Sequence, residues 1–384
     1  MIRGRWRGIL RGSTVNQRLK KLRDKLTEKE IDAIFITQAD NRRYLSGFHG
    51  TAGYLIITDK QAILATDFRY TEQAKSEAPD FIIQRITGGV GVWLPALANE
   101  LKIKRLGFEG GDVTYDFHRQ LRRALNKGRE AARLIPLNGL VEVIRAIKEP
   151  EEKEFITKAS EITDAAFESI EPKIKAGMTE KQVAWELEKA LRESGSESLP
   201  FDIIVGSGPN AALPHAKPSD RIINEGEPIV IDMGGKHQGY ASDLTRTICL
   251  GKITPKFKEV HNVILEAQQT AISKISRGIT GKAADAIARK IIEKAGYGEA
   301  FGHSLGHGVG LAEHEIPYLS PSSKEKLVDG MVFTIEPGIY LAGWGGVRIE
   351  DTVMMEGGKV KLLTHAMKIT SNEKGLSDKS LRGA

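Results

Sequence analysis

Apolar residues in the first 145 positions alternate between helical and strand-like spacing. In residues 15–26 a valine and three leucines recur every three or four positions, which places them on one face of a helix. Residues 33–37 form a short β-rich run, and residues 54–67 have the pattern of two strands around a turn. Helix-like and strand-like segments continue to alternate as far as FHRQLRRALNK. This alternation predicts an α/β domain with a mixed sheet.

A different pattern begins near Glu149, where we place the domain boundary. Pro150 followed by glutamates suits the first turn of a helix. The TEKQ sequence from Thr179 has the form of a capping box, and helical patterns cover 255–275 and 281–295. Around these helices lie the β-type runs IIVGSG, PIVIDMGG, SDLTRTICL, MVFTIEPGIY and VRIEDTVMM. Helices grouped against an antiparallel sheet predict an α+β domain.

The positive charge of the chain is concentrated at its start. The net charge is +6, but residues 1–25 alone carry nine basic residues and one acidic residue, a net of +8. The remaining residues therefore have a net charge of −2, which argues against a nucleic-acid-binding protein. We divide the chain into a basic, disordered start (1–14), an N-terminal domain (15–148), a catalytic domain (149–371) and a polar tail (372–384).

Composition indicates a globular protein from a reducing compartment. Of the 384 residues, 40% are hydrophobic and 28% are charged, as in soluble globular proteins. The single cysteine, Cys249, cannot form an internal disulfide. The sequence has no run of about 18 apolar residues, so we expect no membrane helix. The basic start lacks the apolar core of a secretory signal. We therefore expect a cytoplasmic protein with no membrane partner.

Two aspartates lie beside apolar β-type runs in PIVIDMGGKHQGYASDLTRT. Asp232 directly follows one run, a glycine-containing turn comes next, and Asp243 begins the returning segment. Two antiparallel strands would bring both carboxylates to one face. Like charges in an apolar setting require a cation. The alternative is an ordinary hairpin with exposed turn aspartates, and this segment alone leaves that alternative open.

The segment FTIEPGIYLAGWGGVRIEDTVMM repeats this design with Glu336 and Glu350. Each glutamate lies in an otherwise apolar run, and Arg348 shares a face with Glu350 because they are two residues apart. Buried acids are rare unless they are paired or metal-bound. Four carboxylates and one imidazole suit two divalent cations. Oxygen-rich ligation favours Mn²⁺, Co²⁺, Fe²⁺ or Zn²⁺ without a thiolate.

Three histidines lie in the segment GHSLGHGVGLAEHE. His303 and His307 are four residues apart, as in a helical zinc site, and His314 follows seven residues later. A helical site would read HExxH, whereas this segment has no such glutamate and is rich in glycine. Each interior glycine disfavours a helix by about 1 kcal/mol relative to alanine. We therefore predict a strand or loop that lies close to another segment, with one histidine joining the carboxylates.

These acids and one histidine, in their order and contexts, resemble the pita-bread metallopeptidases of the aminopeptidase P and proline dipeptidase (prolidase) family. The contexts are VIDMG, SDLTRT, GHGVG, TIEPGIY and VRIEDT. The N-terminal half is similar to the creatinase-like N-domain at DNRRYLSGF and TDFRYTEQA. The resemblance implies a curved antiparallel sheet in the catalytic domain. It implies the metal ligands Asp232, Asp243, His307, Glu336 and Glu350.

The resemblance also implies roles for residues around the metals. Glu336 would pass a proton from water to the leaving group. Arg348 would orient the carboxylates beside it. His215, His303 and His314 would lie near the substrate without binding metal. A metal and one histidine, either His215 or His314, would stabilise the oxyanion.

The implied reaction is hydrolysis of the peptide bond before proline with two divalent cations, Mn²⁺ or Co²⁺ first and Zn²⁺ or Fe²⁺ as alternatives. Phe201 and Tyr340 would line a proline pocket, or equally belong to the core. Many prolidases that this chain resembles carry arginine four residues after the equivalent of His314. Here that residue is Tyr318, which offers a hydrogen bond but no charge for a substrate carboxylate. We therefore favour an aminopeptidase P-like enzyme over an Xaa-Pro dipeptidase.

Other classes of protein remain as alternatives. A non-catalytic binding protein on the same fold would be expected to lose ligands, and a metal-free creatinase-type hydrolase would lack the carboxylate set. A methionine aminopeptidase would not need the first 145 residues. The expected partners are proline-containing peptides and a second copy of the chain in a homodimer, with no nucleic acid.

Overall fold

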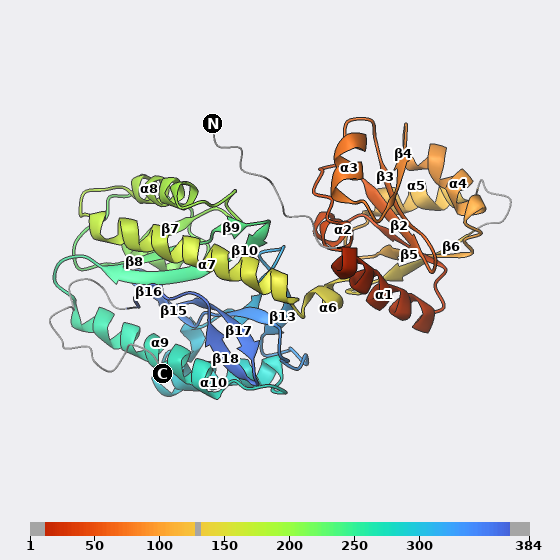
Figure 1. Ribbon diagram of the computed structural model, residues 1–384. Coiled ribbons are helices and arrows are strands. Elements are labelled where there is room, and N and C mark those ends of the chain that lie inside the picture. The colour runs from red at the N-terminus through yellow and green to blue at the C-terminus, as the bar shows by residue number, and fades with distance from the viewer. Residues whose placement is uncertain (1–11, 127–131, 369–384) are drawn as a thin grey trace. The chain divides into compact units, whose positions relative to one another are not determined.

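The computed structural model describes residues 12–126 and 132–368. Contacts divide the chain into two compact units, Met1–Arg145 and Ala146–Ala384, and each is described by itself (Figure 1). The predicted polar tail lies outside the described residues, as does the basic start up to residue 11. The first helix begins at Gly12, inside the predicted start. No helix in the described ranges is long and apolar enough to cross a membrane.

The N-terminal unit is built on a six-stranded mixed sheet, as predicted. Its strands are β1 (Ala33–Ile36), β2 (Tyr54–Thr58), β3 (Ala62–Thr66), β4 (Ile82–Arg85), β5 (Arg105–Glu109) and β6 (Arg133–Leu137). Their order is β4-β3-β2-β1-β5-β6. The β1–β2 and β2–β3 pairs are antiparallel, whereas β1–β5, β3–β4 and β5–β6 are parallel. Pro136 lies in edge strand β6, where a missing N–H group is tolerated.

Helices surround this sheet because their apolar stripes need a partner. They are α1 (Gly12–Glu28), α2 (Ala39–Ser46), α3 (Thr71–Glu77), α4 (Val90–Glu100), α5 (Tyr115–Leu125) and α6 (Glu142–Arg145). The stripe predicted for residues 15–26 is buried. Helices α4 and α5 pack beside each other, and their apolar residues share one core cluster with Phe35 and Ile56 of the sheet (Figure 1). The short helices α2 and α6 carry no helical periodicity that would have predicted them.

The described part of the C-terminal unit contains four long helices, and their ends follow local capping signals. They are α7 (Pro150–Ile170), α8 (Glu180–Glu193), α9 (Pro255–Lys274) and α10 (Gly281–Lys294). Thr179 accepts a hydrogen bond from the Gln182 amide, and Gln182 accepts one from the Thr179 amide, so the predicted capping box is present. Thr254 and Thr280 are the N-caps of the next two helices, and each side chain accepts one hydrogen bond, from the amide of Phe257 and of Ala283 respectively.

The strands of the C-terminal unit pair in an antiparallel manner. They are β7 (Ile204–Ser207), β8 (Pro228–Met233), β9 (Lys236–His237), β10 (Tyr240–Ala241), β11 (Leu244–Cys249), β12 (Gly306–Gly308), β13 (Glu315–Leu319), β14 (Val332–Ile335), β15 (Gly338–Leu341), β16 (Gly345–Arg348), β17 (Asp351–Glu356) and β18 (Lys359–Leu362). A three-stranded sheet has the order β11-β8-β7, and a five-stranded sheet has the order β13-β12-β14-β17-β18. The α+β prediction is confirmed.

Each sheet buries one face against its own pair of helices. Apolar residues of α7 and α8 form one cluster with β7, β8 and β11. Those of α9 and α10 form a second cluster with β14 and β17. Figure 1 shows the two helix pairs over different sheets of the unit. Because side chains alternate along a strand, each sheet also has a face turned away from its helices.

The glycine-rich histidine segment forms strand β12 and not a helix. Gly306 lies so close to β14 that a Cβ atom there would stand 2.0 Å from the carbonyl oxygen of Thr334. Only glycine allows this approach without a backbone shift. The prediction of a strand that lies close to another segment is confirmed.

We expect Gly306→Ala to destabilise the protein. The methyl group would push β12 away from β14, and overpacking of this kind costs about 1–3 kcal/mol. Urea unfolding of the metal-free protein measures the change in the free energy of unfolding. Gly302→Ala is the matched control, because nothing lies within 4 Å of its added Cβ, and its change should stay within about 0.5 kcal/mol. Equal stability of the two variants would contradict the close approach.

Candidate metal centre

Strand alternation turns the four acids away from the helices. In β8, Ile229, Ile231 and Met233 contact the α7–α8 layer, so Asp232 faces the other way. Asp232 pairs with Thr245 across the β8–β11 ladder. Asp243 lies two residues before Thr245, at the spacing that returns a side chain to the same face. The two aspartates therefore approach each other from neighbouring strands.

The second pair of acids is brought together by the β14–β17 ladder. Its last paired rung joins Ile335 to Asp351, and Glu336 and Glu350 are the next residues beyond that rung. The amide of Glu350 donates to the carbonyl of Thr245, 3.0 Å away, which joins this ladder to the β8–β11 ladder. The four carboxylates consequently lie where the two sheets meet.

His307 completes this group from β12. Its Nε2 atom lies 3.3 Å from Oε1 of Glu336 and 3.7 Å from Oδ2 of Asp243. Ligand atoms of Asp243, His307 and Glu350 all lie within 4.8 Å of one another. The structure thus brings together all five residues that the resemblance implied as ligands, from positions more than 100 residues apart in the chain.

Two aspartate oxygens in this group are buried without a partner. Oδ1 of Asp232 and Oδ1 of Asp243 have no hydrogen-bond donor among the described residues. An ionised carboxylate oxygen in such a position is costly unless a cation contacts it. The alternative of exposed turn aspartates is therefore wrong. The donor set of four carboxylates and one imidazole fits divalent cations.

The crowding and burial of these acids shift their pKa values. Burial, reinforced by the neighbouring acids, raises the pKa of Asp243 and of Glu350 well above the usual range. Burial also raises the pKa of Asp232, although Arg348 opposes it. Burial would raise the pKa of Glu336 as well, but the hydrogen bond and charge of His307 outweigh it and bring that pKa down to about 2.

Arg348 organises the carboxylates from one side. Its Nη2 donates to Oδ2 of Asp232 at 2.6 Å, and its Nε donates to Oγ1 of Thr245 at 2.9 Å. Thr245 in turn donates to Oε2 of Glu350 at 2.5 Å. One guanidinium therefore reaches two acids, one directly and one through a hydroxyl. Sequence reasoning did not single out Thr245, although its position two residues after Asp243 was a usable signal.

Tyr340 links Arg348 to His303. The phenol oxygen accepts a hydrogen bond from Nη1 of Arg348 at 2.8 Å and lies 3.0 Å from Nε2 of His303. Nδ1 of His303 lies 2.8 Å from the carbonyl of Ser304, so Nδ1 carries the proton and Nε2 accepts from the phenol. Burial lowers the pKa of His303, in keeping with a neutral ring. Both nitrogens of His303 are thus engaged within the protein.

The other two site histidines lie at the open side of the centre. The ring of His314 is 4.1 Å from that of His307 between centroids, and its side chain is 56% exposed. Burial, and then the charge of His307, lower the pKa of His314, and His215 adds to this lowering. His215 is exposed on the loop after β7. These two imidazoles, unlike His303, are available to a ligand.

The predicted substrate-binding side chains lie around the centre at different depths. Phe201 packs over Gly234, where a Cβ would stand 3.0 Å from the phenyl ring. Tyr318 pairs with His307 across the β12–β13 ladder, and its own side chain is exposed. Tyr340 is committed to the arginine and histidine described above.

A second layer of buried charge lies on the opposite face of the same strands. Asp351 follows Glu350 and points the other way, where it accepts from Arg246 at 2.7 Å and from Gln268 at 2.7 Å. Arg246 also donates to the backbone carbonyl of Glu350. Lys368 and Thr364 complete the contacts of Asp351. Sequence reasoning missed this layer, although Asp351 directly follows Glu350 and Arg246 directly follows Thr245.

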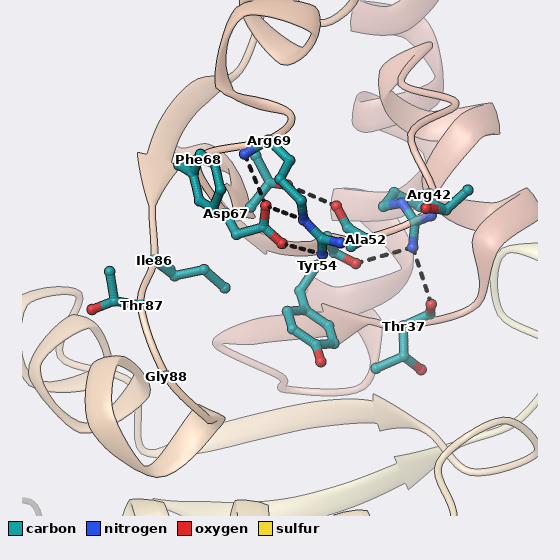
Figure 2. Close-up of a pocket in the computed structure, with 13 residues that line it drawn as sticks. Thr37, Arg42, Ala52, Tyr54, Asp67, Phe68, Arg69, Ile86, Thr87 and Gly88 are labelled. Atoms are coloured by element: carbon teal, nitrogen blue, oxygen red, sulfur yellow. Dashed lines mark hydrogen bonds and ion pairs between the residues drawn. The ribbon is translucent and has the colours of Figure 1, made fainter.

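A cavity with a volume of about 710 Å³ lies in the N-terminal unit (Figure 2). Figure 2 shows Arg69 paired with Asp67 and Arg42 turned towards backbone carbonyls. Arg42 donates to the carbonyls of Gly50 and Gly53. These charged groups are already used in holding the fold. The cavity therefore offers no cluster comparable to the carboxylates of the C-terminal unit.

Family comparisons agree with this centre. The model of metallopeptidase family M24 matches residues 154–356, and that of the creatinase/prolidase N-terminal domain matches residues 18–147. The chain belongs to metallopeptidase family M24. All five candidate ligands lie inside the matched range, and the predicted two-domain fold is confirmed.

Individual relatives match along nearly the whole chain. An Xaa-Pro dipeptidase of Pyrococcus horikoshii is 39% identical over 351 residues, which cover 91% of this chain and 97% of that protein. The solved Xaa-Pro dipeptidase of Bacillus anthracis is 41% identical with a TM-score of 0.89, covering 92% of this chain and 99% of that one. The solved X-Pro aminopeptidase of Thermotoga maritima is 38% identical with a TM-score of 0.84, covering 91% and 98%.

We expect divalent cations to stabilise this M24 protein against unfolding. The ligands converge only in the folded state, so Mn²⁺ at 100 times its dissociation constant should raise the free energy of unfolding by about 2.7 kcal/mol. Urea unfolding with Mn²⁺ and after chelation measures this increment. Asp243→Asn should reduce it, whereas Asp59→Asn, in an exposed turn, should not. An undiminished increment in Asp243→Asn would place the cation elsewhere.

Proposed function

We propose that the protein is a metal-dependent exopeptidase that hydrolyses the bond between an N-terminal residue and a following proline. The observation that carries this proposal is the pair of orphaned, buried aspartate oxygens among four carboxylates and one imidazole. Membership of the M24 family and relatives named for Xaa-Pro cleavage support the same activity.

The residues that would hold two divalent cations are Asp232, Asp243, His307, Glu336 and Glu350. When bound, the cations supply a water of lowered pKa as a nucleophile near neutral pH. We propose that both cations are Mn²⁺ or Co²⁺, with Zn²⁺ or Fe²⁺ as alternatives. Arg348 keeps the carboxylates in place throughout, because its guanidinium is shared between Asp232 and the Thr245–Glu350 pair.

Protein groups would then handle the proton and the developing charge. Glu336 takes a proton from the attacking water at its carboxylate and delivers it to the leaving proline nitrogen. The exposed imidazoles of His215 and His314 donate hydrogen bonds to the carbonyl oxygen as it gains charge. His303 plays a different part, since both of its ring nitrogens are engaged by Ser304 and Tyr340. We propose that it fixes Tyr340 and, through it, Arg348.

The length of the peptide is the point on which two candidate activities differ. The exposed Tyr318 offers no charge for a free carboxylate, which favours an aminopeptidase acting on longer peptides. The similar proteins named Xaa-Pro dipeptidase favour the dipeptide. Phe201 remains the proposed apolar contact for the proline ring. We also propose that the protein forms a homodimer and that it works in the cytoplasm.

Glu336→Gln should abolish activity without unfolding the protein. The amide cannot accept the water proton, and loss of a general base costs about 100- to 10,000-fold in rate. Steady-state kinetics on a Mn²⁺-loaded sample, with circular dichroism as a folding check, measure both properties. Glu356→Gln is the control, because that glutamate is an exposed residue of β17. Wild-type kcat in Glu336→Gln would refute the role of Glu336.

Peptide length should be decided by comparing Ala-Pro with Ala-Pro-Ala on the metal-loaded enzyme. We expect both to be cleaved after alanine, with the longer peptide favoured in kcat/KM. Chelation should abolish cleavage and Mn²⁺ or Co²⁺ should restore it. Cleavage of the dipeptide alone would establish the dipeptidase activity instead. Undiminished cleavage by the chelated protein would overturn the metal-dependent mechanism.

A further inference from the structure

His215 lies on a loop whose backbone has little regular structure. The loop leaves β7 at Ser207, passes through a 3-10 turn at Gly208–Ala212, and returns towards β8. His215 itself is exposed, and the contacts of an exposed side chain cannot hold a loop in place. The groups that fix the loop must therefore lie elsewhere.

One buried carboxylate holds both ends of this loop. Glu180, the first residue of α8, is 0% exposed. Its Oε1 accepts from the amide and the hydroxyl of Ser207, both at 2.8 Å. Its Oε2 accepts from the amide of Ser219 at 3.0 Å and from the hydroxyl of Ser219 at 2.6 Å. Nδ2 of Asn210 lies 3.1 Å from each oxygen.

These contacts satisfy the buried charge with donors from the loop alone. A carboxylate has about four lone-pair sites, so the serine amides and hydroxyls together suffice to fill them. The position at the start of α8 adds the favourable end of the helix dipole. Hydrogen bonds to a charged acceptor are about twice as strong as neutral ones. Residues 207 and 219 are thereby tied to one point across twelve positions of chain.

The middle of the loop is held from the metal centre. Nη1 of Arg348 donates to the carbonyl of Pro214 at 3.2 Å, next to His215. Gly346 lies so close that a Cβ there would stand 2.2 Å from the carbonyl of Ala211. The loop is therefore fixed at its ends by Glu180, with Arg221 also donating to the hydroxyls of Ser207 and Ser219, and beside the histidine by Arg348.

We propose that Glu180 is a positioning residue that sets His215 over the reacting carbonyl by clamping residues 207–219. This proposal rests on the proposed function, in which His215 donates to the substrate. Among the described residues, Glu180 forms no hydrogen bond or ion pair with the five candidate ligands, so its effect reaches the reaction through the loop. Loss of the clamp allows the loop to move while the carboxylate centre keeps its own contacts.

The test is a double-mutant cycle between Glu180→Gln and His215→Ala on Mn²⁺-loaded enzyme. Glu180→Gln should lower kcat about 10- to 100-fold, the range usual for residues that orient a functional group. KM and bound metal should change little. In the His215→Ala background the same substitution should lower kcat by less than about threefold, because the two changes act on one group. Asp329→Asn is the control, since that carboxylate holds the amide of Gly358 in another loop.

Hydrogen exchange of the peptide spanning residues 207–219 supplies a readout independent of activity. It should be faster in Glu180→Gln than in the wild type, and unchanged in Asp329→Asn. Ser219→Ala, which removes one donor, should show a smaller effect in the same direction, and it carries the test if Glu180→Gln does not fold.

The outcomes separate this proposal from the proposed function. Equal loss of kcat in both backgrounds would show a purely structural role and overturn the inference, as would unchanged kcat or unchanged exchange. In each of those cases the Xaa-Pro peptidase would stand. A wild-type protein that cleaves no Xaa-Pro peptide would overturn the function and the inference together.

Discussion

The mutual repulsion of four buried carboxylates is the constraint around which the C-terminal unit is organised. Among the described residues, neither Asp243 nor Glu350 forms an ion pair with an arginine or a lysine, and burial raises the pKa of both. Without cations, the described residues offer only His307 and Arg348 as charged partners at short range. Such a group is stable only where the surrounding packing prevents its members from separating. The two sheets and their helices provide that packing.

Because side chains alternate along a strand, one strand can present an acid to the metal centre on one face and a charged residue to the helices on the other face. Thr245 and Glu350 face the centre, whereas the next residues, Arg246 and Asp351, face the helix side and form a fully buried ion pair. The face towards the centre thus holds excess negative charge, which a cation can neutralise. The face towards the helices holds an ion pair whose charges balance. Breaking a buried pair is costly, about 3–5 kcal/mol when one partner is removed. The buried Arg246–Asp351 pair therefore helps to fix the positions of Thr245 and Glu350 on the opposite face.

Buried acids also support the loops that carry histidines. Glu180 clamps the loop of His215, and Glu315, next to His314, forms a buried ion pair with Lys148. The amide of Lys148 also donates to the carbonyl of Gly330. Loops that bear functional groups need such support because their own backbones lack ladder hydrogen bonds. Two buried acids therefore hold the backbone close to His215 and His314.

The sequence by itself determined those features that depend on interactions between residues close together in the chain. Helix caps, apolar periodicity and acids embedded in apolar runs act over a few residues, so the long helices and the four acids could be recognised in the chain, whereas the choice of His307 rested on the family resemblance. The glycines around His307 likewise excluded a helical zinc site. Only the tertiary structure decided that His303 is engaged by Tyr340, that Thr245 links Arg348 to Glu350, and that Glu180 holds a loop. These contacts join residues 27 to 105 positions apart. No local pattern specifies them, because they exist only after segments far apart in the chain have packed together.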